Sequence, residues 1–424
     1  MSNIQIRNKA PNINPVRNKL HTESETITVK SLPDIKNMVQ RGARVEYFLI
    51  GALLLLALLL RISFLPFESD DYQRYLVVWY NFIKANGGFL ALKYNVGNYT
   101  PFYFYFIVLM SYIPLPQLVL FKVLSIFFDF MLAFGVYLIA RLKYPRGYAP
   151  LIASVLVLFA PTVCINSALW AQCDSILASF AVAGLYFLLK RRPWLACFCF
   201  GLAFSFKPQG AFLFPLLLLL WMKQEISIKH LMMIPAAYLL MIFPAFLAGR
   251  PLTDLLTVYL AATSDVPYIT LNAANFWEWF PNSQFSILHQ SGLILALACA
   301  LLLCLVVYMR HPKMSNRLLV MLAFIFALCV PFFLPQMHER YFYTADIMSV
   351  IYACYIPRQF YLAIGVQLAS LFSYAPFLFG ITVINLSLLA FITLGAMIVT
   401  ISALIRELYF ANCDAPQDIT PRDF

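Results

Sequence analysis

The chain has 424 residues, of which 62% are hydrophobic and 12% are charged, and its formal net charge is +11. A soluble domain carries about 25% charged residues, so this composition excludes an ordinary soluble protein. Apolar runs of about 20 residues recur along most of the chain, and each is long enough to cross the hydrocarbon core of a bilayer. The runs are continuous and do not alternate with polar residues, which indicates helices rather than a barrel. The predicted fold class is therefore an all-α, polytopic membrane helix bundle.

The N-terminal segment is basic and has no apolar periodicity. Residues 1–45 hold eight Lys/Arg and three acidic residues. This clustering in a polar segment predicts a disordered cytoplasmic tail over residues 1–44, and it argues against a nucleic-acid partner. The segment is too long and too polar to be a cleaved signal peptide. We expect a transmembrane domain over residues 45–409 and a second cytoplasmic tail over residues 410–424.

Twelve membrane spans are predicted between the two tails, which leaves both termini on the same side. They lie near residues 45–66, 116–141, 148–164, 170–190, 193–207, 209–222, 230–249, 285–309, 315–333, 341–357, 360–375 and 379–405. The apolar piece at residues 101–114 is too short to cross comfortably. We predict that it forms a re-entrant or interfacial helix.

Basic residues collect in short loops that alternate with polar loops along the chain. The loops at residues 140–146, 190–193, 223–230 and 310–317 are rich in Lys/Arg, which predicts that they are cytoplasmic. The remaining loops then face outside, and only six of the 30 Lys/Arg fall there: Arg74, Lys84, Lys93, Lys207, Arg250 and Arg340. We therefore predict a multi-pass protein of the inner (cytoplasmic) membrane, with both termini in the cytoplasm.

The first outer loop, residues 67–100, begins with two adjacent acids. Ser69 or Asp70 suits the N-cap of a helix. Apolar residues then recur at a spacing of three to four, which predicts an amphipathic helix that "ANGG" ends; they are Tyr72, Leu76, Trp79, Tyr80 and Ile83. Asp70 and Asp71 are either a solvated cap or a general base at the lip of a cavity.

Two further polar clusters lie at outward-facing ends of spans. In "INSALWAQCDSI", Trp170 is compatible with an interface belt, whereas Asp174 is an ionisable group at membrane depth, which usually faces a cavity or a partner. In "FSFKPQGAF", Lys207 precedes a Pro and has no acid nearby in sequence. It either snorkels toward the headgroups or contributes to a site.

The fourth cluster is in "FFLPQMHERYFY". His338 and Arg340 together would suit a phosphate, because Arg offers a rigid fork of donors and a helix start adds free N–H groups. The simpler alternative is an ion pair of Glu339 with Arg340 or Lys207. Together the four clusters predict a site for an anionic phosphate, a lipid tail and a sugar-like head.

The nine cysteines predict no metal site. Most lie in apolar runs, and no CxxC pair is matched by a second one. We expect them to be buried as small hydrophobic side chains.

The motifs "SDDYQRYLVVWY…NYTPFY", "ALWAQCDSI", "FKPQG" and "LPQMHERYFY" resemble the GT-C superfamily of polytopic glycosyltransferases. The nearest likeness is to bacterial proteins related to the second mannosyltransferase of GPI-anchor synthesis. The resemblance implies a GT-C-like fold. It also implies the inverting transfer of a hexose from a polyprenyl-phosphate donor to a glycolipid or glycan on the outer face, with mannose as the first candidate for the hexose. It also implies a mechanism that needs no metal cofactor.

The resemblance also assigns roles to residues. Asp71 would be the catalytic base, with Asp70 as the second choice, and the donor phosphate would contact His338, Arg340 and Lys207. The remaining substrate-binding residues would be Tyr72, Asn98, Trp170, Gln172, Asp174, Gln209, Glu339 and Tyr341. Ala171 stands where the resemblance would place Gly.

A secondary transporter or a flippase of envelope precursors is the competing function. Transporters commonly contain paired repeats and polar breaks near the membrane midplane. This sequence has no evident repeat, and its polar clusters lie at one end of the predicted spans.

Overall fold

In the computed structural model the structure describes residues 32–261 and 267–410. The chain divides into two compact units, Met1–Leu54 and Leu55–Phe424. The described part of the first unit belongs to α1, Leu32–Ser63, so residues 32–44 of the predicted tail are helical. Residues 1–31 and 411–424, which include Cys413, lie outside the described residues.

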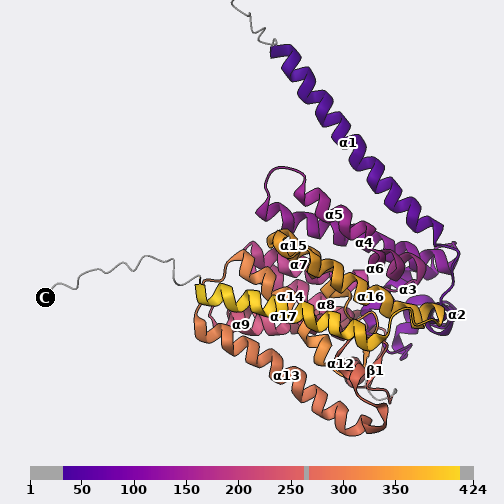
Figure 1. The fold of residues 1–424 in the computed structure, drawn as a ribbon. Coiled ribbons are helices and arrows are strands. Elements are labelled where there is room, and N and C mark those ends of the chain that lie inside the picture. Colours follow the sequence, from indigo (N-terminus) through magenta and orange to yellow (C-terminus); the bar gives the residue numbers. More distant parts are fainter. Residues whose placement is uncertain (1–31, 262–266, 411–424) are drawn as a thin grey trace, which may run out of the picture. The chain divides into compact units, whose positions relative to one another are not determined.

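The second unit is built almost entirely of helices (Figure 1). After α1, the α-helices are α2 Val77–Ala85, α3 Pro101–Ser111, α4 Gln117–Lys143, α5 Ala149–Phe159, α6 Pro161–Cys164, α7 Asp174–Leu189, α8 Pro193–Phe206, α9 Phe214–Met222, α10 Ile228–Leu231, α11 Met233–Leu247, α12 Leu252–Ala261, α13 Phe285–Arg310, α14 Asn316–Phe333, α15 Tyr343–Tyr355, α16 Tyr361–Phe379 and α17 Leu386–Phe410. Short 3-10 or π-helical turns are η1 Tyr72–Leu76, η2 Gly88–Lys93, η3 Ile165–Leu169, η4 Pro208–Leu213, η5 Phe276–Trp279, η6 Asn282–Gln284 and η7 Pro357–Gln359. Two short strands are β1 Thr270–Leu271 and β2 Met337–His338. The predicted all-α polytopic bundle is confirmed.

Six described helices are long and apolar enough to cross a membrane, or seven if a bent pair counts as one span. The six are Gln117–Lys143, Ile228–Leu247, Asn282–Arg310, Asn316–Phe333, Pro357–Phe379 and Leu386–Tyr409. The bent pair, α5 with the helical segment Pro161–Leu169, turns by 49°. Pro161 explains the break, because a proline disfavours helical backbone in the residue before it.

Each of the twelve predicted spans coincides with one helix or with two consecutive helices. Several of these, such as α7 and α8, are shorter than 18 residues. The count of twelve crossings therefore stays a prediction. The interfacial piece corresponds to α3, whose 11 residues extend about 16 Å, which is too short to cross.

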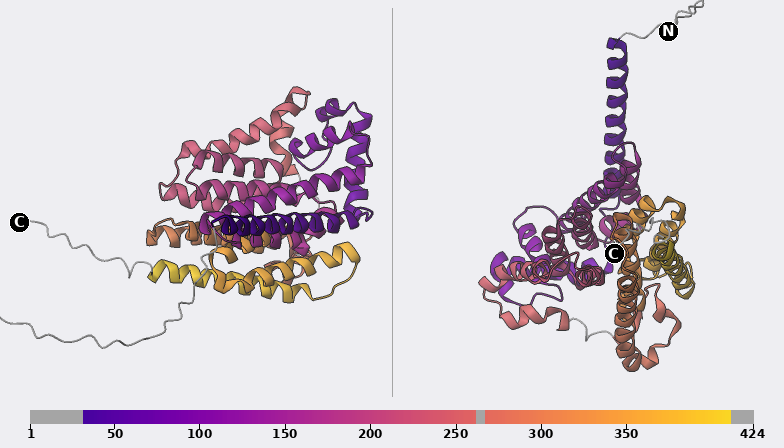
Figure 2. Two further views of the ribbon diagram at one scale, coloured as in Figure 1. Left: turned by 90° about the horizontal axis from the view of Figure 1, so that it is seen from above. Right: turned by 90° about the vertical axis from the view of Figure 1, so that its left-hand side faces the viewer.

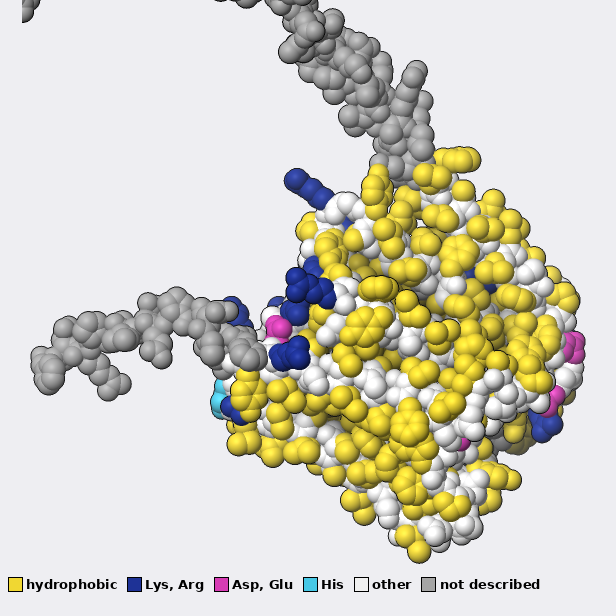
Figure 3. Space-filling model, in the orientation of Figure 1, with side chains coloured by type: hydrophobic (Ala, Val, Ile, Leu, Met, Phe, Trp, Pro, Cys, Tyr) yellow, Lys and Arg dark blue, Asp and Glu magenta, His cyan; other side chains and the backbone are white. Residues whose placement is uncertain are grey.

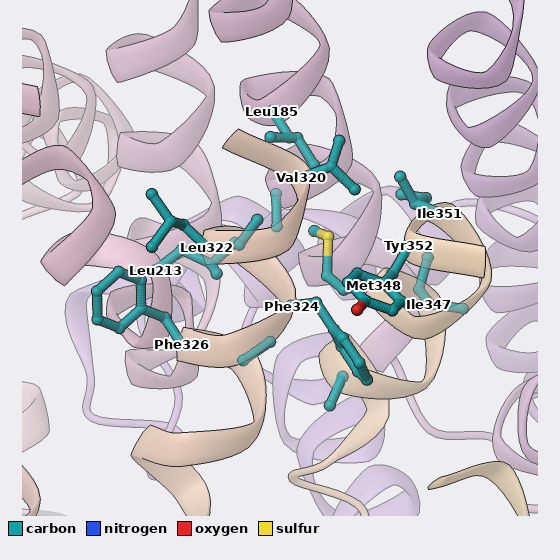
Figure 4. Close-up of a cluster of buried hydrophobic side chains, with 14 of the residues drawn as sticks. Leu185, Leu213, Val320, Leu322, Phe324, Phe326, Ile347, Met348, Ile351 and Tyr352 are labelled. Atoms are coloured by element: carbon teal, nitrogen blue, oxygen red, sulfur yellow. The ribbon is translucent and has the colours of Figure 1, made fainter. Parts of the chain in front are cut away.

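α14 lies at the centre of the packing. It contacts α7, α9, α13, α15 and α17, and 78% of the 18 residues over Asn316–Phe333 are buried. Figure 4 shows Val320, Leu322, Phe324 and Phe326 of α14 among side chains from α7, η4 and α15. In Figure 2 the orange to yellow helices, α13–α17, form a group beside the magenta helices. Close van der Waals packing of this kind holds helices together in a bilayer.

The loop over residues 67–100 packs against α3, α4 and α11. The five residues of the predicted apolar face are all buried: Tyr72, Leu76, Trp79, Tyr80 and Ile83. The helix ends as predicted, because Gly87 and Gly88 have φ of 83° and 63°, a conformation that favours glycine. This packing fixes the position of the residues just before Tyr72.

A two-residue strand pair joins the loop before α13 to the loop before α15. β1 and β2 are parallel, with Thr270 beside Met337 and Leu271 beside His338. Glu339 N donates to Leu271 O at 3.0 Å on the same ladder. The pairing holds the segment that carries His338 to the loop before α13, and no alternation in the sequence predicted it.

A buried ion pair lies where the end of α1 meets α4. Arg61 Nε lies 2.8 Å from Asp129 Oδ2, and both side chains are fully buried. Ser167 Oγ donates to the same carboxylate oxygen at 2.5 Å, and Arg61 Nη2 donates to Leu158 O at 2.9 Å. This pair was not predicted, although charged residues inside apolar runs indicate such a pair.

Basic side chains gather at one end of the helices. Figure 3 shows most of the visible Lys and Arg on the left, at the C-terminal end of α17. Residues 190–193 join the C-terminal end of α7 to the start of α8. The opposite ends of these two helices carry Asp174 and Lys207.

Candidate active site

Asp71 lies in the first turn of the helical segment that continues into η1 and α2, held there by Ser69. Tyr72 N donates to Ser69 Oγ at 3.2 Å, which confirms the predicted cap, and the hydroxyl itself donates to Trp170 O at 2.8 Å. Trp170 Nε1 and Gln172 Nε2 then donate to Asp71 Oδ2 at 3.0 Å and 2.5 Å. Two segments about 100 residues apart therefore meet at one carboxylate.

The two oxygens of Asp71 have different surroundings. Both hydrogen bonds and the ion pair with Arg340 Nη1, at 3.7 Å, fall on Oδ2. Oδ1 makes no hydrogen bond with the described residues, and the side chain keeps 13% of its surface exposed. This oxygen is free to accept a proton or a hydrogen bond from a ligand.

The turn that carries Trp170 and Gln172 is unusual in its backbone. η3 tightens into a turn in which Gln172 N donates to Asn166 O at 2.8 Å. Ala171 has φ of 64°, in the left-handed region that costs a non-glycine residue about 1–2 kcal/mol. This turn directs both donors at Asp71, and it explains why glycine would suit the position.

Asp174 and Lys207 form the second part of the site. Lys207 Nζ lies 2.5 Å from Asp174 Oδ1, and Asn166 Nδ2 donates to Oδ2 at 2.8 Å. Lys207 follows the last residue of α8, where Pro208 begins η4. The ammonium group also lies 5.1 Å from the centre of the Tyr99 ring. The alternative of a snorkelling lysine is wrong, because the side chain is buried and paired.

Arg340 joins the two parts. Its guanidinium donates to Glu339 Oε1 at 2.8 Å, and it lies 3.7 Å from Asp71 and 3.9 Å from Asp174. It also lies over the Trp170 ring at 5.2 Å. The simpler ion pair predicted for Glu339 is thus present, within a larger network.

Burial and charge shape the outer edge of this network. Burial alone would raise the pKa of Glu339, but His338 and Arg340 together hold that pKa below its ordinary value. The His338 ring lies 5.1 Å from the Tyr341 ring and keeps 31% of its side-chain surface exposed. Its Nδ1 lies 3.8 Å from Glu339 Oε2. Of the three basic side chains His338, Arg340 and Lys207, His338 is therefore the most exposed.

Three backbone N–H groups beside His338 and Arg340 are used within the fold. The N–H groups of Glu339, Tyr341 and Tyr343 donate to Leu271, His338 and Arg340 carbonyls. They are not free, because this segment pairs with β1 and closes two turns before α15 begins. A phosphate here would depend on side chains.

The side chains of four predicted site residues make no hydrogen bond or ion pair with the described residues of this network. Asp70 is 69% exposed and pairs with Arg74 at 3.0 Å. Tyr72 is buried against Phe121. Asn98 is exposed, and Gln209 in η4 has a buried Oε1 without a partner among the described residues.

Several residues that shape the site were not predicted to have a role. Asn166 and Tyr99 contact Asp174 and Lys207, and both lie inside the quoted motifs. Phe377 stacks on Trp170 with ring centres 5.0 Å apart, and Tyr374 lies edge-on at 5.4 Å. These two come from α16, where no sequence signal marked them.

No three His, Cys, Asp or Glu side chains within residues 32–261 and 267–410 form a group that could hold a metal ion. The described cysteines are free thiols, and most are buried. Metal independence stays a prediction.

Comparison with known proteins identifies one family. Residues 102–223 match the MptA_B family, described as alpha-(1->6)-mannopyranosyltransferase, N-terminal domain. The match includes Trp170, Asp174 and Lys207, and it ends before Arg340. No curated protein sequence matches the chain. The resemblance to polytopic mannosyltransferases is thereby supported, whereas the link to GPI-anchor synthesis stays a prediction. The chain is a glycosyltransferase built as a multi-pass membrane helix bundle, and its residues 102–223 are similar to the mannosyltransferase family.

Proposed function

We propose that the protein transfers mannose, with inversion, from a polyprenyl-phosphate donor to an acceptor hydroxyl on the outer face of the membrane. The observation that carries this proposal is the geometry of Asp71. Two neutral donors fix one carboxylate oxygen, and the other oxygen remains open. A base needs this combination of fixed orientation and access to a proton.

Asp71 is the better candidate for the base than its neighbour. Asp70 is solvated and paired with Arg74 on the outer surface. Asp71 Oδ1 would take the proton from the acceptor hydroxyl as the hydroxyl oxygen attacks the anomeric carbon. The bond from that carbon to the phosphate oxygen breaks on the opposite face, and the electron pair leaves with the phosphate.

The departing phosphate must be stabilised by positive charge, and basic side chains lie together at one edge of the site. Arg340, Lys207 and His338 would offset the charge that grows on the leaving oxygen, an electrostatic effect like that of an oxyanion hole. The described network has three carboxylates, Asp71, Asp174 and Glu339, and two permanent cations. His338 keeps 31% of its side-chain surface exposed, so its ring is the group of this edge that a phosphate can reach most easily.

The placement of charge supports an outward-facing site. Asp174 and Lys207 lie at the ends of α7 and α8 that are opposite to the basic loop 190–193. Loops rich in Lys/Arg are typically cytoplasmic. A site at one end of the helices also fits an enzyme that meets its substrates at the membrane surface better than it fits a transporter or flippase.

The test is transfer from radiolabelled polyprenyl-phosphate mannose to membrane glycolipids by the purified protein, with EDTA present. We expect transfer to persist in EDTA and the new linkage to be the inverted anomer. Arg340→Ala should lower the rate by about a hundredfold or more, in the range of a lost transition-state contact. Arg310→Ala, at the C-terminal end of α13, is the matched control.

Absence of transfer with this donor and with other sugars on the same lipid would contradict the proposed donor class. Solute uptake by vesicles containing the silent protein would instead favour transport. A retained anomer would contradict direct displacement.

A further inference from the structure

A lysine inside α4 binds the turn that leads to Asp71. Lys122 is fully buried, and its ammonium group donates three hydrogen bonds to backbone carbonyl oxygens just after α1. The acceptors are Phe64 O at 2.8 Å, Leu65 O at 3.2 Å and Phe67 O at 2.6 Å. An ammonium group has three donors, so this one turn uses all of them. The mechanism proposed above gives Lys122 no role.

The charge of Lys122 has no carboxylate in contact with it. None of the ion pairs among the described residues includes this side chain. A charged group is costly to bury. In a membrane protein, a buried ionisable group of this kind usually marks a functional site. Lys122 therefore calls for a role beyond packing.

α4 contacts the chain on both sides of Asp71. Phe67, whose carbonyl oxygen accepts from Lys122, lies four positions before Asp71. Tyr72 directly follows Asp71 and packs edge-on against Phe121, with ring centres 6.3 Å apart. Since Phe121 and Lys122 are neighbours on α4, the helix fixes the segment that carries the carboxylate at two points.

The same helix also holds the turn that supplies the two donors to Asp71. Ser167 Oγ donates to Asp129 Oδ2 at 2.5 Å, and Ser175 Oγ donates to Ser125 O at 3.0 Å. The two serines lie on either side of that turn, and both acceptors belong to α4. The position of the carboxylate relative to its donors therefore depends on how each segment is bound to α4.

We propose that Lys122 is a positioning residue for the transfer reaction, because its ammonium group fixes the turn that precedes Asp71. The base then lies within hydrogen-bond distance of Trp170 and Gln172. This inference rests on the proposed function, in which Asp71 is the base. Lys122 acts through the backbone, and a displacement of about 1 Å in an active site can lower a rate about a hundredfold.

The first experiment compares Lys122→Met with Lys143→Met in transfer assays and melting curves. Lys143 provides the matched control, because it lies at the other end of α4 and also donates to carbonyl oxygens, at 3.1 Å to Cys354 O and 2.7 Å to Tyr355 O. We expect both variants to melt at a lower temperature than wild type. Only Lys122→Met should lower kcat, by about thirtyfold to a hundredfold, with the KM for the donor within about twofold of wild type.

Two further variants separate positioning from a general loss of stability. Lys122→Arg keeps a cation with several donors and should recover at least about a third of the wild-type kcat. In the Lys122→Met protein, adding Trp170→Phe should lower kcat by less than about threefold, because the hydrogen bond that it removes is already displaced. In the Lys143→Met protein, the same change should have its full wild-type effect.

Hydrogen exchange gives a readout that needs no activity. Tyr72 N donates to Ser69 Oγ at 3.2 Å, so this amide reports on the cap beside Asp71. Mass spectrometry of peptides from residues 68–80 should show exchange about tenfold faster in Lys122→Met than in wild type. Lys143→Met should leave exchange in these peptides unchanged. If Lys122→Met does not fold, Lys122→Gln replaces it, since its amide keeps two donors, and its kcat should fall about tenfold.

Wild-type kcat and wild-type exchange in Lys122→Met would overturn the proposal. Equal losses of kcat in the Lys122 and Lys143 variants would also overturn it, because they would reflect stability alone. Failure of the proposed function would show differently. The wild type would then transfer no mannose, while exchange over residues 68–80 would still distinguish Lys122→Met from Lys143→Met.

Discussion

Trp170 Nε1 donates a hydrogen bond to Asp71 Oδ2 at 3.0 Å, although 99 positions separate the two residues. The indole is itself fixed, because its ring stacks on Phe377 and Arg340 lies over it. A single tryptophan therefore orients the proposed base and supports the proposed phosphate contact. Its position links the loop over residues 67–100, the turn before α7 and the segment before α15.

Replacing Trp170 with Phe tests this orientation. The change keeps an aromatic ring for Phe377 and Arg340 but removes the donor to Asp71. We expect kcat to fall about tenfold to a hundredfold with little change in thermal stability, because Gln172 still holds the carboxylate. Steady-state transfer assays and a melting curve measure the two quantities. An unchanged kcat would contradict the orienting role.

The Lys207–Asp174 pair allows a double-mutant cycle. Lys207→Met or Asp174→Asn alone leaves a buried group without its partner, and each should reduce the free energy of unfolding by about 3 kcal/mol. The double variant should lose less than the sum of the two, because the pair is removed together. Reversible unfolding in mixed detergent micelles gives these values. Additive losses would mean that the two charges do not interact.

Ala171→Gly should stabilise the protein. The backbone at this position has φ of 64°, which glycine adopts without the steric cost that alanine carries. We expect a gain of about 1 kcal/mol and unchanged transfer. Ala171→Val should do the opposite, because a branched side chain fits the left-handed region worst. A destabilised glycine variant would show that the strain in this turn is small.

Glu278 should make stability depend on pH. Its pKa is raised to about 7 in the fold, against 4.5 ordinarily, so the folded state keeps a proton that the unfolded state releases. Stability should therefore be highest below about pH 4.5 for this group and should fall as pH rises through about 7. The loss is at most about 3.5 kcal/mol, because each pKa unit corresponds to about 1.4 kcal/mol.

Glu278→Gln should remove this part of the pH dependence, since glutamine does not titrate. Melting temperatures of both proteins between pH 5 and pH 8.5 provide the comparison. The difference between them should grow with pH. Parallel curves would show that the carboxyl group does not titrate in this range.

Apolar patterns predicted much of the fold. Continuous apolar runs predicted the positions of the helices, because a segment that crosses a bilayer must form all its backbone hydrogen bonds internally. The period of Tyr72 and Leu76 predicted the buried face of the outer-loop helix, because that face must pack. Ser69 followed from cap chemistry.

Pairing between distant segments could not be predicted in this way. The strands β1 and β2 are two residues long, too short for any alternation. Arg61 and Asp129 stood in the sequence as isolated charges in apolar runs, and only the fold brings them together. The turn at Ala171 also depends on η3, and no local sequence pattern predicted this π-helical turn.

The candidate site shows the same division. The motifs predicted Asp174, Lys207 and Arg340 as site residues, because charged residues at the ends of membrane spans need partners. They did not separate Asp70 from Asp71, since adjacent residues have the same composition around them. The difference comes from helix geometry, which turns one carboxylate outward to Arg74 and the other toward Trp170.

The most direct test compares Asp71→Asn with Asp70→Asn in the transfer assay with purified protein and polyprenyl-phosphate mannose. The two variants make the same chemical change one residue apart, and melting curves establish that both are folded. We predict that Asp71→Asn lowers kcat by about a hundredfold to ten-thousandfold, while Asp70→Asn stays within about threefold of wild type. Wild-type transfer by Asp71→Asn, or a greater loss in Asp70→Asn, would contradict the assignment of Asp71 as the base.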